Sequence, residues 1–226
     1  MINARLVDRD MDSSGAIFAR DGIIERVFAG TLPSSDDEAE LKRLRADPSV
    51  ETVDARGAVL MPAFVDLHAH FRDPGFTQKE DAVTGSRAAC AGGYGTVVLM
   101  ANTNPVISTS EAALAVNARV KAAGLVDAFQ AVSLTRNFDG QDTTELVSLD
   151  AKEVPVATED GREVASASVM LRAMESCARS GVVVSCHCED PVLARSAKPF
   201  RDTALIAARE GRESDERANL AEAERR

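Results

Sequence analysis

Two histidines at alternate positions form the most chemically informative pattern in the sequence. His68 and His70 stand in the segment DLHAH, at the end of an apolar run. Successive side chains of a β-strand point to opposite faces, so both imidazoles are expected on one side, with Ala69 facing away. That spacing suits two ligands of one metal ion. The alternative is a pair of half-buried histidines that bond backbone carbonyls.

The third histidine ends another apolar run, VVVSCHCED, residues 182–190. His187 has Cys186 and Cys188 on either side. In a regular strand the two cysteines share one face and His187 takes the other, so the three cannot bind one ion. We therefore predict that the cysteines are small packing residues. Zinc ligation by both cysteines is the alternative.

The elements that must position these residues alternate in type. Helical segments separate apolar strand-like runs near residues 60–67, 96–101, 127–134, 154–158 and 182–188. Strands that are apolar on both faces require a parallel sheet covered by helices. Gly124 and Gly181 follow two helical segments, where a left-handed residue ends a helix. Residues 58–226 therefore predict the α/β class, as a partial TIM-type (β/α) barrel of about five βα units that ends in one charged helix, residues 204–226.

The first part of the chain has a different texture. Residues 1–57 form short alternating segments broken by Gly, Asp and Ser, which predicts a small β-sandwich-like subdomain of antiparallel strands. Residues 32–49 are rich in Ser, Asp, Glu and Arg and predict a solvated loop or a short helix.

Composition excludes several classes of partner. With 45% hydrophobic and 27% charged residues the chain is globular, and its net charge of -10 repels nucleic acid and anionic lipid. No apolar run reaches the ~18 residues that cross a bilayer. We therefore expect no membrane partner and a cytoplasmic location. Without a secretory signal, the four cysteines are expected to be reduced.

A longer motif surrounds the first two histidines. Residues 66–106 read DLHAHFRDPGFTQKEDAVTGSRAACAGGYGTVVLMANTNPV. They resemble dihydroorotases of the amidohydrolase superfamily, whose pattern is D-L-H-x-H-F-R-x-P-G, a K-E-D helix start, A-A-x-G-G and an M-P-N-T-x-P loop. Ala101 stands where that family usually has proline.

The resemblance implies a set of metal ligands. His68 and His70 match the first two. VATEDGREV, residues 156–164, is similar to the family's F-T-D-D-G segment. This similarity implies that Asp160 is a metal ligand, in the role that a carboxylated lysine has in another branch of the family. The alternative is that Asp160 belongs to an ordinary Asp-Gly turn. His187 matches the next ligand, in H-x-E-D. Lys152 precedes its strand, and we discount it as a carboxylated bridge.

The resemblance also implies substrate-binding residues, namely His70, Arg72 and Asn102. The guanidinium of Arg72 suits a substrate carboxylate because it can bond both oxygens at once. The alternatives are a solvated loop arginine and, for Asn102, a turn former before a proline.

The activity implied by the resemblance is the reversible hydrolysis of dihydroorotate to N-carbamoyl-aspartate in pyrimidine biosynthesis, with one or two zinc ions. The family's general-base aspartate and a further ligand histidine are expected beyond the chain end. A half-barrel exposes sheet edges, so we expect a homodimer or a larger assembly, including one with other pyrimidine-pathway enzymes. The alternatives are a hydantoinase, dihydropyrimidinase or allantoinase, and a non-catalytic scaffold subunit.

Overall fold

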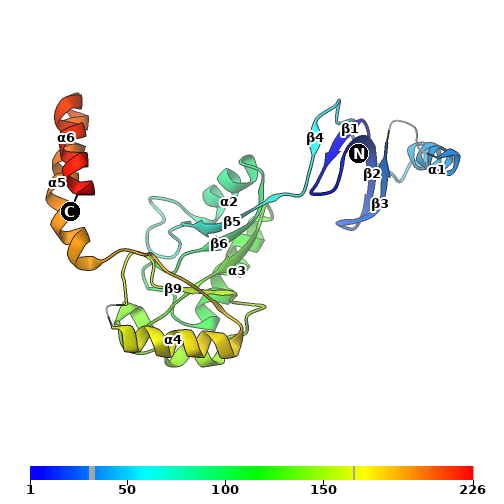
Figure 1. Ribbon diagram of the computed structural model, residues 1–226. Coiled ribbons are helices and arrows are strands. Elements are labelled where there is room, and N and C mark those ends of the chain that lie inside the picture. Colours follow the sequence, from blue (N-terminus) through cyan, green and yellow to red (C-terminus); the bar gives the residue numbers. More distant parts are fainter. Residues whose placement is uncertain (31–33, 165, 226) are drawn as a thin grey trace. The chain divides into compact units, whose positions relative to one another are not determined.

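The computed structural model describes residues 1–30, 34–164 and 166–225 (Figure 1). The fold is mixed α/β and divides into two compact units, Met1–Ala63 and Phe64–Arg226. Each unit is described by itself. Leu32 and Pro33, at the start of the expected loop or short helix, and Arg226, at the end of the expected final helix, lie outside the described residues.

The first unit is a four-stranded sheet of order β3-β2-β1-β4. Its strands are β1 (Ala4–Val7), β2 (Asp12–Arg20), β3 (Ile23–Ala29) and β4 (Val59–Leu60). The first three pair in antiparallel fashion, as predicted, whereas β4 runs parallel to β1.

A helix covers this sheet. Helix α1 (Ser35–Ala46) begins after Ser34, whose hydroxyl oxygen accepts the backbone N–H of Asp37. Its Leu44 packs with Ala16 and Phe28 of the sheet in a small apolar core. Among the described residues of this unit the second layer is thus a helix, which differs from the sandwich-like pair of sheets that the sequence suggested.

A proline divides the strand expected at residues 60–67. Strand β4 ends at Leu60, and β5 (Phe64–Ala69) opens the second unit. Pro62 lies between them and has no N–H to donate to a sheet. The single expected strand is therefore two strands, and each belongs to a different unit.

The strands of the second unit pair in the order in which they occur in the chain. One parallel sheet joins β5, β6 (Tyr94–Leu99) and β7 (Asp127–Gln130), and a second joins β8 (Val132–Ser133), β9 (Val156–Thr158) and β10 (Val183–Ser185). Only Ala131 separates β7 from β8, and its N–H donates to Leu99 O at 2.8 Å. The predicted parallel pairing is present.

Helices alternate with these strands (Figure 1). They are α2 (Ala82–Ala91), α3 (Ser110–Ala123) and α4 (Ala167–Ser180), with two short 3-10 helices, η1 (Arg136–Phe138) and η2 (Thr144–Ser148). Asp81 and Thr84 form a capping box at the start of α2. Helices α3 and α4 end at Gly124 and Gly181 with φ of 69° and 75°, the left-handed ends that the sequence predicted.

Strand β6 is buried on both faces. Val97 and Leu99 pack into the main core, and Val98 and Met100 pack into a second cluster with Ala131. Each strand face in this part of the sheet therefore meets apolar side chains. This burial explains why the sequence here is continuously apolar and does not alternate with polar residues.

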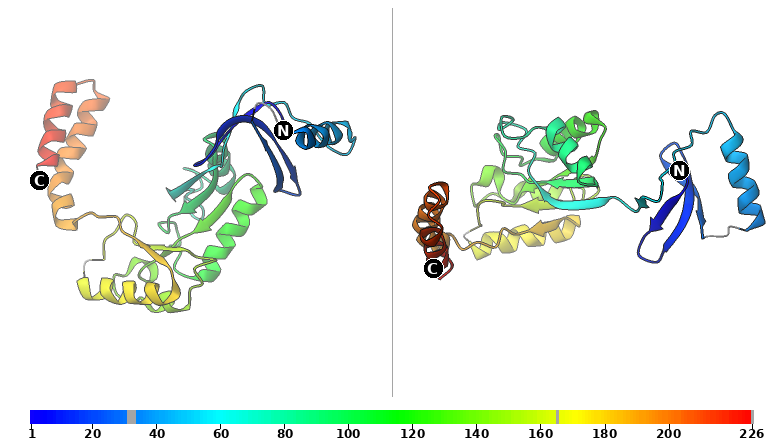
Figure 2. Two further views of the ribbon diagram at one scale, coloured as in Figure 1. Left: turned by 45° about the vertical axis from the view of Figure 1, so that its right-hand side comes forward. Right: turned by 90° about the horizontal axis from the view of Figure 1, so that it is seen from above.

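The final segment contains two helices. Helix α5 (Pro191–Arg209) and α6 (Glu213–Glu224) pack against each other, and the left view of Figure 2 shows them side by side. Gly211, with φ of 70°, separates them. The single helix expected over residues 204–226 was wrong because this left-handed residue interrupts it. None of the helices described is both long and apolar enough to cross a bilayer.

Candidate metal centre

The two histidines of the DLHAH segment lie at the carboxyl end of β5. The rings of His68 and His70 are near each other, with centroids 5.1 Å apart and planes inclined by 70°. Both side chains are accessible to some extent, at 49% for His68 and 27% for His70. Their common direction is the one that alternation along the strand predicts.

Two further predicted ligands follow paired residues of β9 and β10. Thr158 and Ser185 are register partners, and Asp160 and His187 stand two residues beyond them. Neighbouring parallel strands end at the same edge of a sheet. The side chains of Asp160 and His187 therefore lie at the same edge of this sheet. The side chain of Asp160 is only 5% exposed.

The carboxylate of Asp160 lies close to the imidazoles of all three histidines. Its Oδ1 lies 3.5 Å from His68 Nε2 and 3.3 Å from His187 Nδ1. Its Oδ2 lies 3.5 Å from His70 Nε2. Ligand atoms of His68, His70 and Asp160 all lie within 4.8 Å of one another, whereas His187 contacts Asp160 outside that tighter group.

The chemistry of this donor set fits a divalent metal ion. A buried carboxylate is costly unless a cation or strong hydrogen bonds compensate it. Among the described residues, the ion-pairing partners of Asp160 are histidines and include no lysine or arginine. Burial, and next the positive charge of Arg72, lower the pKa of His70, which favours the neutral imidazole that can bind a metal.

Two of the three predicted substrate-binding residues, Arg72 and Asn102, lie beside this group, and the third, His70, belongs to it. Asn102 Oδ1 is 3.0 Å from His70 Nδ1 and 3.5 Å from Arg72 Nη1. Asn102 Nδ2 donates a hydrogen bond of 2.6 Å to Asp160 Oδ2. Arg72 has a left-handed φ of 60°, an unfavourable conformation for a residue with a side chain, and such residues gather at functional sites.

Close packing fixes the loops that carry Arg72 and Asn102. Met100 N–H donates to Ala69 O at 3.0 Å, which joins the ends of β5 and β6. A Cβ on Gly75 would lie 2.0 Å from Asn104 O, so only glycine allows the loop after β5 to approach the loop after β6 this closely. The two loops therefore hold each other in place.

One buried acid of the site was not predicted from the sequence. Glu159 is 4% exposed, and its carboxylate accepts hydrogen bonds from the hydroxyl and, at 3.0 Å, from the N–H of Thr135. Burial raises the pKa of Glu159. The residue links the end of β9 to the loop after β8. Its position immediately before Asp160 was the available signal, but the sequence does not reveal its partner.

The cysteines around His187 differ from expectation. Strand β10 ends at Ser185, and Cys188 has a left-handed φ of 59°. The alternation of a regular strand therefore does not extend to these residues. Cys186 and Cys188 are both exposed, so their assignment as packing residues was wrong.

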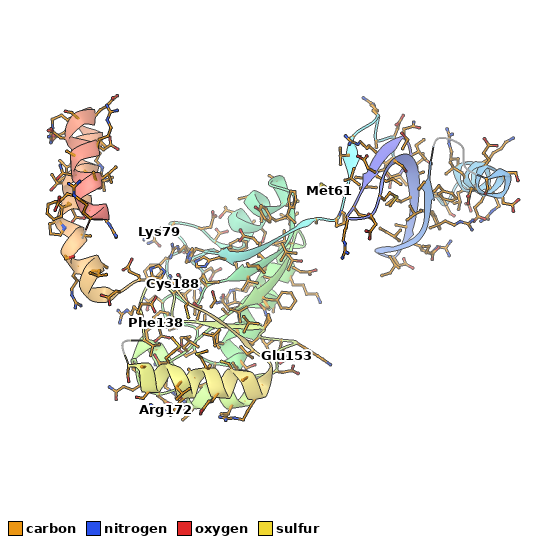
Figure 3. The ribbon with its side chains drawn as sticks, viewed as in Figure 1. Met61, Lys79, Phe138, Glu153, Arg172 and Cys188 are labelled. Atoms are coloured by element: carbon orange, nitrogen blue, oxygen red, sulfur yellow. The ribbon has the colours of Figure 1, made fainter. Side chains whose placement is uncertain are left out.

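The excluded lysine lies away from this edge. Lys152 stands in a turn before β9, where its N–H bonds the side chain of Asp150. Figure 3 shows the neighbouring Glu153 on the opposite side of the unit from Cys188 and Phe138, which follow β10 and β8. Lys152 thus precedes the strand that leads to Asp160.

Fold and site together define an α/β chain with a candidate metal centre at the carboxyl ends of parallel strands. The chain belongs to the dihydro-orotase-like family, whose family model matches residues 57–202. This match confirms the resemblance seen in the sequence.

Curated relatives agree with the family. A dihydroorotase of Clostridium botulinum is 38% identical over 195 residues, which cover 86% of this chain and 46% of the relative. A dihydroorotase of Geobacter sulfurreducens is 40% identical over 149 residues, covering 66% and 35%. The chain therefore spans less than half the length of these relatives.

Solved structures share the fold. The L-hydantoinase (dihydropyrimidinase) from Arthrobacter aurescens matches with a TM-score of 0.66 and 20% identity, over 89% of this chain and 43% of that one. A D-hydantoinase matches with a TM-score of 0.65 and 18% identity, over 93% and 43%. At such identities the likeness concerns the fold alone.

Proposed function

We propose that this chain supplies the metal-binding part of a zinc-dependent dihydroorotase, which opens the ring amide of dihydroorotate to N-carbamoyl-aspartate in pyrimidine biosynthesis. The observation that carries the proposal is the gathering of His68, His70 and Asp160 within 4.8 Å at the ends of two strands. His187 completes the proposed ligand set through its approach to Asp160.

Imidazole nitrogens and a carboxylate oxygen are ligands that zinc accepts. A zinc ion held by His68, His70, Asp160 and His187 would supply Lewis acidity and would lower the pKa of water to roughly 7. The residues of this chain would hold one or two such ions.

The neighbouring side chains favour a substrate that carries a carboxylate. Arg72 lies within 3.5 Å of Asn102, and Asn102 lies within 3.0 Å of His70. A guanidinium next to the metal ligands can form two charge-assisted hydrogen bonds with the carboxylate of dihydroorotate. The uncharged rings of hydantoinase substrates offer it no such partner. We therefore assign substrate binding to His70, Arg72 and Asn102.

The strand order supports a partial TIM-type barrel. Strands β5, β6 and β7 pair in parallel in chain order, and so do β8, β9 and β10, as consecutive strands of a (β/α) barrel do. Strand β5 is an edge strand among the described residues, and it exposes Phe64, Val65 and Leu67 by 50%, 56% and 69%. Such an edge favours coverage by further polypeptide, from the same protein or from a second copy.

An assay of substrate preference tests this proposal. We expect zinc-loaded protein, with whatever further sequence its gene encodes, to prefer dihydroorotate to dihydrouracil, hydantoin and allantoin. Arg72→Met should lower kcat/KM for dihydroorotate about 30-fold or more. The substitution leaves the substrate carboxylate in the site without its charged partner, which costs about 2 kcal/mol or more.

The exposed arginine of α2 provides the control. Arg87→Met removes the same charge elsewhere in the unit and should leave kcat/KM unchanged. Preference for an uncharged ring, or an unaltered kcat/KM in Arg72→Met, would contradict the proposal.

A further inference from the structure

The amide of Asn102 is surrounded by three chemically distinct groups. Its oxygen faces His70 Nδ1 at 3.0 Å and Arg72 Nη1 at 3.5 Å. Its nitrogen faces Asp160 Oδ2 at 2.6 Å. One short side chain therefore contacts two proposed metal ligands and the proposed substrate-binding arginine.

The chemistry of two neighbours fixes which way the amide points. A guanidinium only donates hydrogen bonds, so Arg72 must face the amide oxygen. An ionised carboxylate only accepts them, so Asp160 must face the amide nitrogen. The oxygen and nitrogen of an asparagine amide can often be assigned either way round. For Asn102 the two neighbours allow only one assignment.

The fixed amide determines the tautomer of His70. The amide oxygen accepts and cannot donate, so the imidazole hydrogen must be on Nδ1. The lone pair is then on Nε2, the atom that lies 3.5 Å from Asp160 Oδ2. A hydrogen bond at one ring nitrogen commonly decides which nitrogen is free to bind a metal.

We propose that Asn102 is a positioning residue that selects the Nδ1–H tautomer of His70 and holds Oδ2 of Asp160, so that both ligands are oriented before a metal arrives. That this orientation serves metal binding rests on the proposed function, whereas the tautomer of His70 does not depend on it. The bond to Asp160 occupies one of the two amide hydrogens, so Asn102 can also contact a substrate.

The backbone around Asn102 restrains the amide. Ala101 O accepts the N–H of Thr103 at 2.8 Å and that of Ile107 at 3.2 Å, and Ala101 itself is 0% exposed. A Cβ on Gly161 would lie 3.6 Å from Asn102 Nδ2, so the turn after Asp160 packs close to the amide. The amide is thus held by its own loop and by the facing turn.

Nitrogen-15 NMR of the histidine rings tests the proposal on the metal-free 226-residue chain. Long-range proton–nitrogen spectra at pH 8 distinguish the two tautomers, and a His70→Gln variant identifies the His70 signals among three histidines. We expect the Nδ1–H form in the wild type. Asn102→Ala should lose this preference, and zinc affinity, measured by calorimetry, should fall about 10- to 100-fold.

Two further variants separate positioning from folding. Asn102→Asp keeps an acceptor for His70 Nδ1–H and should retain the tautomer. Asn117→Ala removes an amide whose oxygen accepts Gln130 N–H at 2.8 Å, so it should lower stability but alter neither the tautomer nor zinc affinity.

Either of two results would overturn the proposal: an Nε2–H tautomer of His70 in the wild type, or an Asn102→Ala variant that retains the Nδ1–H form. The failure of the proposed function is distinguishable from these results. A chain with the expected tautomer that binds no zinc would refute the metal site and leave the role of Asn102 in the tautomer intact.

Discussion

Individual residues show how burial is used differently in the core and at the site. Asp160 is nearly inaccessible but is surrounded by imidazoles and an amide, the environment of a group that binds a cation. Cys177 on α4 is 1% exposed within the apolar core, and burial raises the pKa of its thiol to about 11. Asp160 is thus buried among polar partners, whereas Cys177 is buried among apolar side chains.

The shift at Cys177 predicts a loss of stability at alkaline pH. The unfolded thiol ionises near 9.0 and the folded one near 11, so the stabilisation is complete below pH 9 and is lost as pH rises through 11. A two-unit shift corresponds to roughly 2 to 3 kcal/mol. We expect the stability difference between wild type and Cys177→Ala to narrow by this amount between pH 8.5 and 11 in urea melts.

Removal of an exposed thiol provides the control for this prediction. Cys90→Ala deletes a thiol that is accessible in the folded chain. A difference between wild type and Cys177→Ala that stays constant over the same pH range would show that burial does not affect the ionisation of Cys177.

At the scale of elements, helix α2 is coupled to the loop that carries Arg72. Gly85 is buried on this helix, and a Cβ there would lie 2.5 Å from the ring of Phe71. Phe71 is 7% exposed and directly precedes Arg72. The absence of a side chain at Gly85 therefore makes room for Phe71, the residue before the proposed substrate-binding arginine.

A substitution at Gly85 tests this coupling. Helix propensity alone would make Gly85→Ala stabilising by about 0.5–1 kcal/mol. Because the new methyl group overlaps the Phe71 ring, we expect instead a destabilisation of about 1–3 kcal/mol in denaturant melts. Adding Phe71→Leu should recover part of that loss, a coupling that a double-mutant cycle measures. Stabilisation by Gly85→Ala would contradict the close contact.

At the scale of the whole molecule, pattern-based prediction succeeded where one rule governs a long stretch. Alternation along a strand placed His68 and His70 together, and apolar runs predicted the parallel strands, of which β6 is buried on both faces. Contacts between distant loops could not be predicted this way. The bonds from Asn102 to Asp160 and from Thr135 to Glu159 depend on packing that no local pattern encodes.

Some predicted boundaries of strands and helices were wrong for a related reason. In each case a single residue with special backbone geometry ended an element earlier than the apolar or helical pattern suggested. Pro62 separated a strand of one unit from a strand of the next, and Gly211 divided one expected helix into two. The family motif compensated for some of these gaps, because it pointed to Asp160 and Arg72 without any knowledge of their contacts.

X-ray absorption of the zinc-loaded chain tests most directly the proposal that three strand ends present nitrogen and oxygen ligands to a common zinc ion. We predict a first shell of nitrogen and oxygen at about 2.0–2.2 Å with imidazole scattering, and loss of zinc in Asp160→Asn. A sulfur shell at about 2.3 Å, which would implicate Cys186 and Cys188, or a first shell unchanged in Asp160→Asn, would contradict the account.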